Sequence, residues 1–191
     1  AEVRTDDWAL DFVLTGSQKA LALPPGLAFA AASSAMLDRS AQATNKGYYF
    51  DLLPLMKSLE AFQTPSTPAI SLLFALEVQL GRIMGEGIER RWERHASMRT
   101  ATIEWVDAMR ADGIGIGVLA PEGHRSPTVT CLRLPDGRSG PEVVAAMRER
   151  GWVIGGGYSR LKESTIRIGH MGDHEPLVLG ELLGSLGEVL R

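Results

Sequence analysis

The 191-residue chain carries 20 Lys and Arg residues against 23 Asp and Glu residues, a formal net charge of −3, and 45% of its residues are hydrophobic. This composition is typical of a folded globular protein with one medium or two small domains, and it excludes the strongly basic surface that nucleic-acid binding requires. The longest apolar stretch, residues 26–37, is shorter than the roughly 20 residues of a membrane-spanning helix. We therefore expect no membrane contact and a cytoplasmic location.

Two strands and a helix are the first predicted elements. The apolar runs LDFVLTG (10–16) and GLAFAAAS (26–33) predict buried strands on either side of a turn. A helix is predicted from Thr67, which is suited to the N-cap, with Pro68 at the first helical position. Its apolar face recurs at threes and fours, at Ile70, Leu73, Leu76, Leu80, Met84 and Ile88.

A second helix, ending before Gly113, is predicted from a further apolar face, and we place a domain boundary near residue 95. Beyond the boundary, strand and helix signals alternate, which is typical of an α/β or α+β domain. The helix carries Met98, Ala101, Trp105 and Met109. The elements that follow are a strand over 128–134, a helix over 141–150, strands over 152–156 and 164–169, and a closing leucine-rich helix.

Lys19 is the candidate nucleophile because of its position in a short turn directly after a buried strand. Gly16, Ser17 and Gln18 precede it and are small or polar groups that could donate hydrogen bonds to a phosphate. A lysine beside a desolvated site favours the neutral amine, which attacks carbonyls. A solvated surface lysine is the alternative that these residues leave open.

The segment SQKALALPPGLAFAAAS (17–33) closely resembles the cofactor-lysine segment of class V aminotransferases of the alanine–glyoxylate and serine–glyoxylate (serine–pyruvate) group. The resemblance implies the C-terminal part of the α/β type I pyridoxal-phosphate (PLP) transferase fold. Residues 1–95 would be the C-terminal part of the large PLP-binding domain, and 96–191 the small C-terminal domain. It also implies a homodimer with active sites at the subunit interface. Further family-like segments follow in order: YYFD, TPSTPAISLLFALE, ERRWERH, RSPTVTCLRLP, GWVIGGGY and STIRIGHMGD.

The same resemblance implies the roles of four residues. Lys19 would form the Schiff base with PLP and move the substrate proton, and Gln18 would bind the cofactor phosphate. Thr67 would contact the phosphate of the neighbouring subunit, which suits an anion at a helix N-terminus. Arg167 would grip the substrate carboxylate with its planar fork. Without the resemblance, Gln18 is an ordinary turn residue, Thr67 only a cap, and Arg167 a solvated arginine.

Arg167 lies between Ile166 and Ile168 in a predicted strand, so its side chain is expected on the opposite face from theirs. His170, Asp173 and His174 in the segment HMGDH suggest a metal site, but the histidine pair lacks a third spaced ligand, and we predict no metal. The glycine runs GIGIG and GGG lack the spacing of a dinucleotide fingerprint and are predicted to be turns.

Three functions are compatible with these features. The first is PLP-dependent transamination between a small amino acid, alanine or serine, and a 2-oxo acid, glyoxylate or pyruvate. Cysteine desulfuration is disfavoured because Gln18 replaces the histidine of desulfurases and Cys131 lies within a predicted strand. The third is a non-catalytic, truncated dimerisation or binding module. It is considered because the family's upstream phosphate turn, stacking aromatic and ring-nitrogen aspartate are absent; Asp6, Asp7 and Asp11 lie too near Lys19. We therefore expect the chain alone to be inactive.

Overall fold

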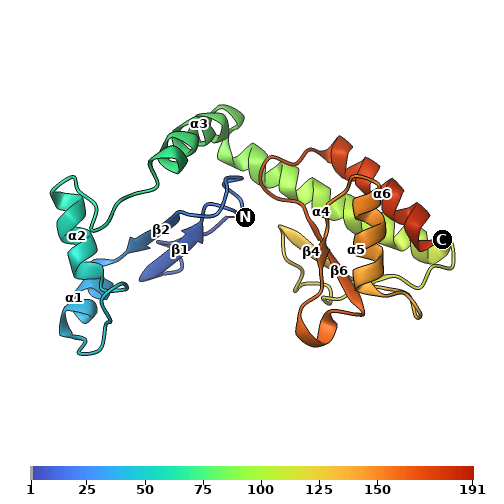
Figure 1. Ribbon diagram of the computed structural model, residues 1–191, viewed down its shortest axis with the longest axis horizontal. Coiled ribbons are helices and arrows are strands. Elements are labelled where there is room, and N and C mark those ends of the chain that lie inside the picture. Colours follow the sequence, from blue (N-terminus) through green and yellow to red (C-terminus); the bar gives the residue numbers. More distant parts are fainter. Residues whose placement is uncertain (1) are drawn as a thin grey trace. The chain divides into compact units, whose positions relative to one another are not determined.

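The computed structural model describes residues 2–191, which divide into two compact units (Figure 1). The first unit comprises residues 2–82 and the second residues 83–191. The predicted boundary near residue 95 falls inside a helix of the second unit. The assignment of the two parts to a cofactor-binding and a small domain stays a prediction.

The first unit contains the two predicted strands, paired antiparallel so that Phe12 lies opposite Ala32 and Gly16 opposite Ala28. Their predicted burial is wrong, because every residue of both strands is exposed or only half-buried. Two helices that the sequence analysis did not anticipate follow the hairpin. Ser33 caps the first of them by accepting a hydrogen bond from the Met36 amide. The bounds are β1 Phe12–Gly16, β2 Ala28–Ala32, α1 Ser34–Gln42 and α2 Leu52–Glu60.

The predicted helix from Thr67 to Ile88 is real but has different ends. Helix α3 spans Ile70–Glu86, and its first hydrogen-bonded turn starts at the Ala69 carbonyl, which accepts from the Leu72 and Leu73 amides. Thr67 is therefore exposed and outside the helix, and its prediction as N-cap is wrong. At the other end Gly87, with a φ of 87°, separates α3 from α4 (Ile88–Ala111).

The second unit is a four-stranded antiparallel sheet in the order β3-β4-β6-β5. Helices α4 and α5 pack against the sheet, and α6 packs against α4 and α5. The strands and helices predicted here are confirmed, although the strand predicted over 152–156 is reduced to two residues. The bounds are β3 Gly117–Val118, β4 Val129–Arg133, α5 Gly140–Glu149, β5 Gly155–Gly156, β6 Thr165–Gly169 and α6 Pro176–Leu190; a short 3₁₀ turn covers Ser159–Leu161.

The hydrophobic core of the molecule lies in this second unit. It forms between the sheet and the three helices, where side chains from every layer are nearly inaccessible to solvent. No helix within residues 2–191 is long and apolar enough to cross a membrane. Central members of the core are Met98 and Val106 of α4, Leu132 of β4, Met147 of α5, Ile166 and Ile168 of β6, and Leu183 and Leu186 of α6.

Candidate active site

The turn that carries Lys19 is held together by Ser17, which is completely buried. The Ser17 hydroxyl donates to the Pro24 carbonyl (2.7 Å) and accepts from the Leu27 amide (3.2 Å). The Ser17 backbone completes the closure, because its amide donates to the Leu27 carbonyl and its carbonyl accepts from the Leu23 amide, each at 3.0 Å. Four hydrogen bonds from one residue therefore fix the backbone next to the lysine.

Lys19 and Gln18 project from this closed turn and are exposed. The Lys19 carbonyl accepts from the amide of Ala22, whose φ of 55° lets the chain reverse direction. A Cβ at Gly16 would lie 2.6 Å from the Gln18 side-chain oxygen, so a larger residue there would displace the Gln18 amide from its present position. The hydroxyl of Ser17 is committed to the turn itself, so our expectation that it could donate to a phosphate is wrong.

The exposed amine of Lys19 and the amide of Gln18 fit a cofactor with an aldehyde and a phosphate. Two of the nearby aspartates have partners of their own. Asp7 pairs with Arg4 at 2.9 Å, and Asp11 accepts from Ser33 at 2.7 Å. The turn thus presents an exposed lysine next to an exposed side-chain amide, and the carboxylates of Asp7 and Asp11 are already paired.

Thr67 is exposed in the first unit, three residues before α3. Within residues 2–191 its hydroxyl makes no hydrogen bond, so it is free to bind a ligand but is not directed toward one. Because Thr67 is not at the helix N-terminus, the free amides and the dipole of α3 do not favour an anion at this residue. Its phosphate role stays a prediction from the family resemblance.

Arg167 lies on β6 between the buried residues Ile166 and Ile168 and is itself half-buried, which confirms the predicted orientation. Its Nε donates to the Gly156 carbonyl at 2.7 Å. Its guanidinium carbon lies 4.2 Å from the centre of the Tyr158 ring. No carboxylate of residues 2–191 pairs with its terminal nitrogens, which leaves two donors for an external carboxylate.

A small cavity of about 160 Å³ adjoins Arg167. Its volume suits a small carboxylate compound, and the lining combines the guanidinium with apolar side chains. A larger cavity of about 530 Å³ elsewhere in the second unit contains none of the predicted site residues. The small cavity is lined by Arg167, Gly155, His174, Val153, Val178 and Leu182, among others.

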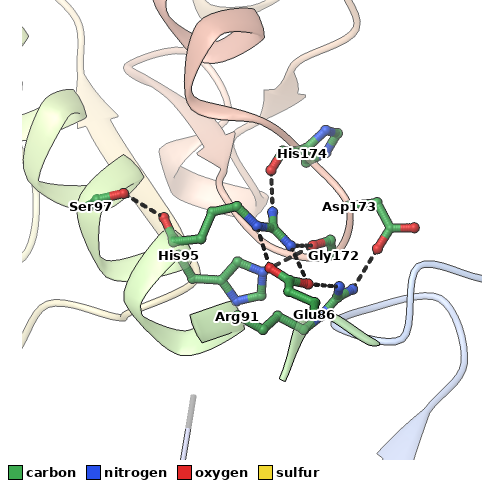
Figure 2. A network of polar contacts seen from close by, with 8 residues as sticks. Glu86, Arg91, His95, Ser97, Gly172, Asp173 and His174 are labelled. Atoms are coloured by element: carbon green, nitrogen blue, oxygen red, sulfur yellow. Dashed lines mark hydrogen bonds and ion pairs between the residues drawn. The ribbon is translucent and has the colours of Figure 1, made fainter. Parts of the chain in front are cut away.

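An ionic network fixes the loop that follows β6 (Figure 2). The Glu86 carboxylate accepts from Arg94 Nε at 2.7 Å and from Arg91 Nη1 at 2.8 Å, and Arg91 Nη2 donates to Asp173 Oδ1 at 2.6 Å. The hydrogen bond from Arg94 is the main cause that lowers the pKa of Glu86 to about 2. Arg91 is buried, and its positive charge is compensated by the carboxylates of Glu86 and Asp173.

The residues considered for metal binding have other roles. His170 is fully buried and shares a hydrogen bond of 2.9 Å with the Thr130 hydroxyl, and burial lowers its pKa to about 4. Asp173 pairs with Arg91. Across residues 2–191 no group of three or more His, Cys, Asp or Glu side chains could hold a metal ion.

Sequence reasoning missed the surroundings of Arg167. The run Gly155–Gly157 was predicted as a turn, although its first two residues also belong to the predicted strand over 152–156, and these two form β5. What was not predicted is the pairing that places Gly155 opposite Arg167 in the sheet. A Cβ at Gly155 would lie 3.3 Å from Arg167 Nη2. The signal was available in the glycines before Tyr158, because glycine within a strand often marks close approach of another group.

The family of the chain follows from its similarity to individual known proteins. No family model matches the chain. It is 38% identical over 173 residues to an uncharacterised aminotransferase of Methanocaldococcus jannaschii, covering 89% of this chain and 44% of the relative. It is 34% identical over 190 residues to the serine–glyoxylate aminotransferase of Arabidopsis thaliana, covering 98% of this chain and 46% of the relative.

Among solved structures, the alanine–glyoxylate aminotransferase of Nostoc sp. matches with a TM-score of 0.89 and 27% identity over 100% of this chain and 51% of that one. The chain spans about half the length of the relatives that it matches. Its fold is accordingly α/β and corresponds to about half of a type I PLP aminotransferase. The chain is a homologue of the class V aminotransferases of the alanine–glyoxylate and serine–glyoxylate group, and covers roughly the C-terminal half of these enzymes.

Proposed function

We propose that the chain supplies the cofactor lysine and the substrate-binding arginine of a PLP-dependent transaminase. The substrates are a small amino acid, alanine or serine, and a 2-oxo acid, glyoxylate or pyruvate. The observation that carries the proposal is the turn at Lys19, which presents an exposed amine from a backbone closed by buried Ser17. The names of the Arabidopsis and Nostoc relatives support the choice of substrates.

The residues of this chain divide the work between binding and proton transfer. When bound, PLP supplies an electron sink for the bonds at the substrate Cα. Lys19 holds the cofactor through its ε-amine and carries a proton to and from that carbon. Gln18 and Thr67 bind the cofactor phosphate, Thr67 from the neighbouring subunit of a homodimer. Arg167 binds the substrate carboxylate through its two free terminal nitrogens.

The proposal requires a further polypeptide region equivalent to the half of the relatives that this chain does not match. A ring-nitrogen partner is needed for turnover, and Asp7 and Asp11 are engaged elsewhere. We therefore propose that residues 1–191 alone bind PLP weakly and do not transaminate. The homodimer and the cytoplasmic location belong to the same proposal.

Covalent capture of the cofactor tests the role of Lys19. The chain is mixed with PLP, reduced with borohydride, digested and mapped by mass spectrometry. The other three lysines of the chain serve as internal controls, since Lys46 pairs with Asp51 at 3.5 Å while Lys57 and Lys162 lie outside the turn. We expect the adduct mainly at Lys19 and its loss in Lys19→Ala. Equal labelling of all four lysines would contradict the assignment.

Turnover is tested by co-expressing the chain with the N-terminal part of the Methanocaldococcus relative that it does not match. Pyruvate formed from alanine and glyoxylate is then measured. We expect activity only in the combined sample, and its loss in Lys19→Ala but not in Lys57→Ala. Sustained turnover by the 191-residue chain alone contradicts the need for the upstream part, and turnover retained in Lys19→Ala contradicts the function.

A further inference from the structure

We propose that Tyr158, together with Gly155, positions Arg167 so that its terminal nitrogens are presented to a carboxylate in the adjoining cavity. The inference rests on the carboxylate-binding role proposed above for Arg167. It adds two positioning residues that act through Arg167.

The ring of Tyr158 forms a stacking surface for the guanidinium. The guanidinium carbon lies 4.2 Å from the ring centre, within the range of a cation–π contact. The other side of Tyr158 is open, since 72% of the residue is exposed. Because Tyr158 is this exposed, it contributes little to the hydrophobic core. Its contact with Arg167 is therefore the main interaction of its ring.

Two backbone features hold the guanidinium in the same place. The Gly156 carbonyl accepts from Nε at 2.7 Å, which occupies the one guanidinium donor that does not belong to the terminal fork. Gly155 has no side chain, and a Cβ there would approach Nη2 and Nε to 3.3 and 3.4 Å, tighter than ordinary contacts. The guanidinium therefore lies against the backbone of β5, with Tyr158 against its plane.

This arrangement lowers the cost of binding a carboxylate. A free arginine side chain populates many rotamers, and it loses conformational entropy when binding of a ligand selects one of them. Here the stacking and the Nε hydrogen bond restrict the side chain beforehand, and the terminal nitrogens have no carboxylate partner within residues 2–191. Both Gly155 and Arg167 line the cavity of about 160 Å³. Loss of the stacking should weaken carboxylate binding while leaving the fold intact.

Nuclear magnetic resonance of the 191-residue chain tests the positioning directly. The Nε–H signal of Arg167 is assigned by its loss in Arg167→Lys, and its hydrogen exchange and the ring-current shift of the neighbouring Hδ protons are measured. Sodium pyruvate is then titrated. In Tyr158→Leu we expect faster Nε–H exchange, loss of the ring-current shift and two- to fivefold weaker pyruvate binding. Gly155→Ala should also speed exchange, by displacing the guanidinium.

Matched variants separate positioning from a general structural effect. Tyr158→Phe keeps the aromatic face and should retain all three properties. Tyr48→Leu removes another highly exposed tyrosine, at 97% exposure, and should change none of them. Exchange and ring-current shift in Tyr158→Leu equal to those of the parent overturn the proposal, as does unchanged pyruvate affinity. A parent chain that binds no pyruvate overturns the carboxylate role of Arg167, while exchange and ring-current shift still decide the positioning.

Discussion

The two units of the chain differ in how they bury apolar surface. In residues 83–191, helices and a four-stranded sheet enclose a core that includes Met98, Leu132 and Ile166 at 0% exposure. In residues 2–82 the buried side chains are Ser17 and Gln79, both polar. Hydrophobic burial is the main favourable term in folding, so the second unit has its own source of stability and the first does not.

The apolar side chains of the first unit are present but lie on its surface. Large apolar side chains that are exposed in such numbers are typical of surfaces that bind other protein. Since the chain spans about half of its relatives' length, we infer that this surface contacts the part of the enzyme that the chain does not match. The exposed side chains include Trp8, Leu14, Tyr48, Tyr49, Phe50, Leu59, Phe62, Phe74 and Val78.

The largest expected effect comes from separating the units. Residues 83–191 expressed alone should unfold cooperatively in urea and show dispersed amide resonances, because they contain the whole core. Residues 2–82 alone should show neither property, because they bury no large apolar side chain. A cooperative transition in residues 2–82 would show that the hairpin and helices are sufficient for a stable fold.

Truncation of one apolar side chain in each unit sharpens the comparison. Ile166→Ala should lower the free energy of unfolding by about 2–5 kcal/mol, since it leaves a cavity in the core. Leu59→Ala, at a side chain 66% exposed, should change it by less than about 0.5 kcal/mol. Urea denaturation followed by tryptophan fluorescence measures both, because Trp8 reports on the first unit and Trp92, Trp105 and Trp152 report on the second. Equal losses would mean that Leu59 is buried in solution.

Acid should destabilise the second unit through His170. Its folded pKa of about 4 lies below the ordinary 6.5, so the unfolded chain binds the proton first and stability falls as the pH drops from 6.5 towards 4. Between pH 6.5 and 4.5 the loss should be on the order of 2 kcal/mol. Burial also lowers the pKa of His95, which adds to the loss in the same direction. Glu86 contributes only below its ordinary 4.5, as the pH falls towards 2.

The measurement is urea denaturation of the full chain at the two pH values. His170→Gln should reduce the pH dependence, whereas His124→Gln, at an exposed position, should leave it unchanged. A pH dependence that persists in full in His170→Gln would assign the effect to another group.

The smallest effect on stability is expected at the apolar surface of the first unit. Phe62→Ser, at a residue 98% exposed, should change the free energy of unfolding by less than about 0.5 kcal/mol but reduce self-association of the chain. Leu177→Ser, at a residue 76% exposed in the second unit, is the control and should leave self-association unchanged. Sedimentation velocity distinguishes the two variants. Equal self-association of the two variants would contradict the prediction that the chain associates through the exposed apolar side chains of the first unit.

Local patterns in the sequence determined most elements and one orientation. Period-2 alternation placed Arg167 opposite Ile166 and Ile168, and the apolar runs around the Lys19 turn became β1 and β2. The motifs around Lys19 and Arg167 also identified the family, which the similarity to known aminotransferases confirms. These features depend on neighbours within a few residues, which a sequence shows directly.

Only the tertiary structure decided what surrounds the two candidate site residues. The burial of Ser17 depends on bonds to Pro24 and Leu27, seven and ten positions away. The stacking of Tyr158 on Arg167 depends on β5 pairing with β6, which brings Gly155 opposite Arg167. Such contacts arise from chain reversal and strand pairing. They are set by the closure of the whole unit around its core, and no local spacing encodes them.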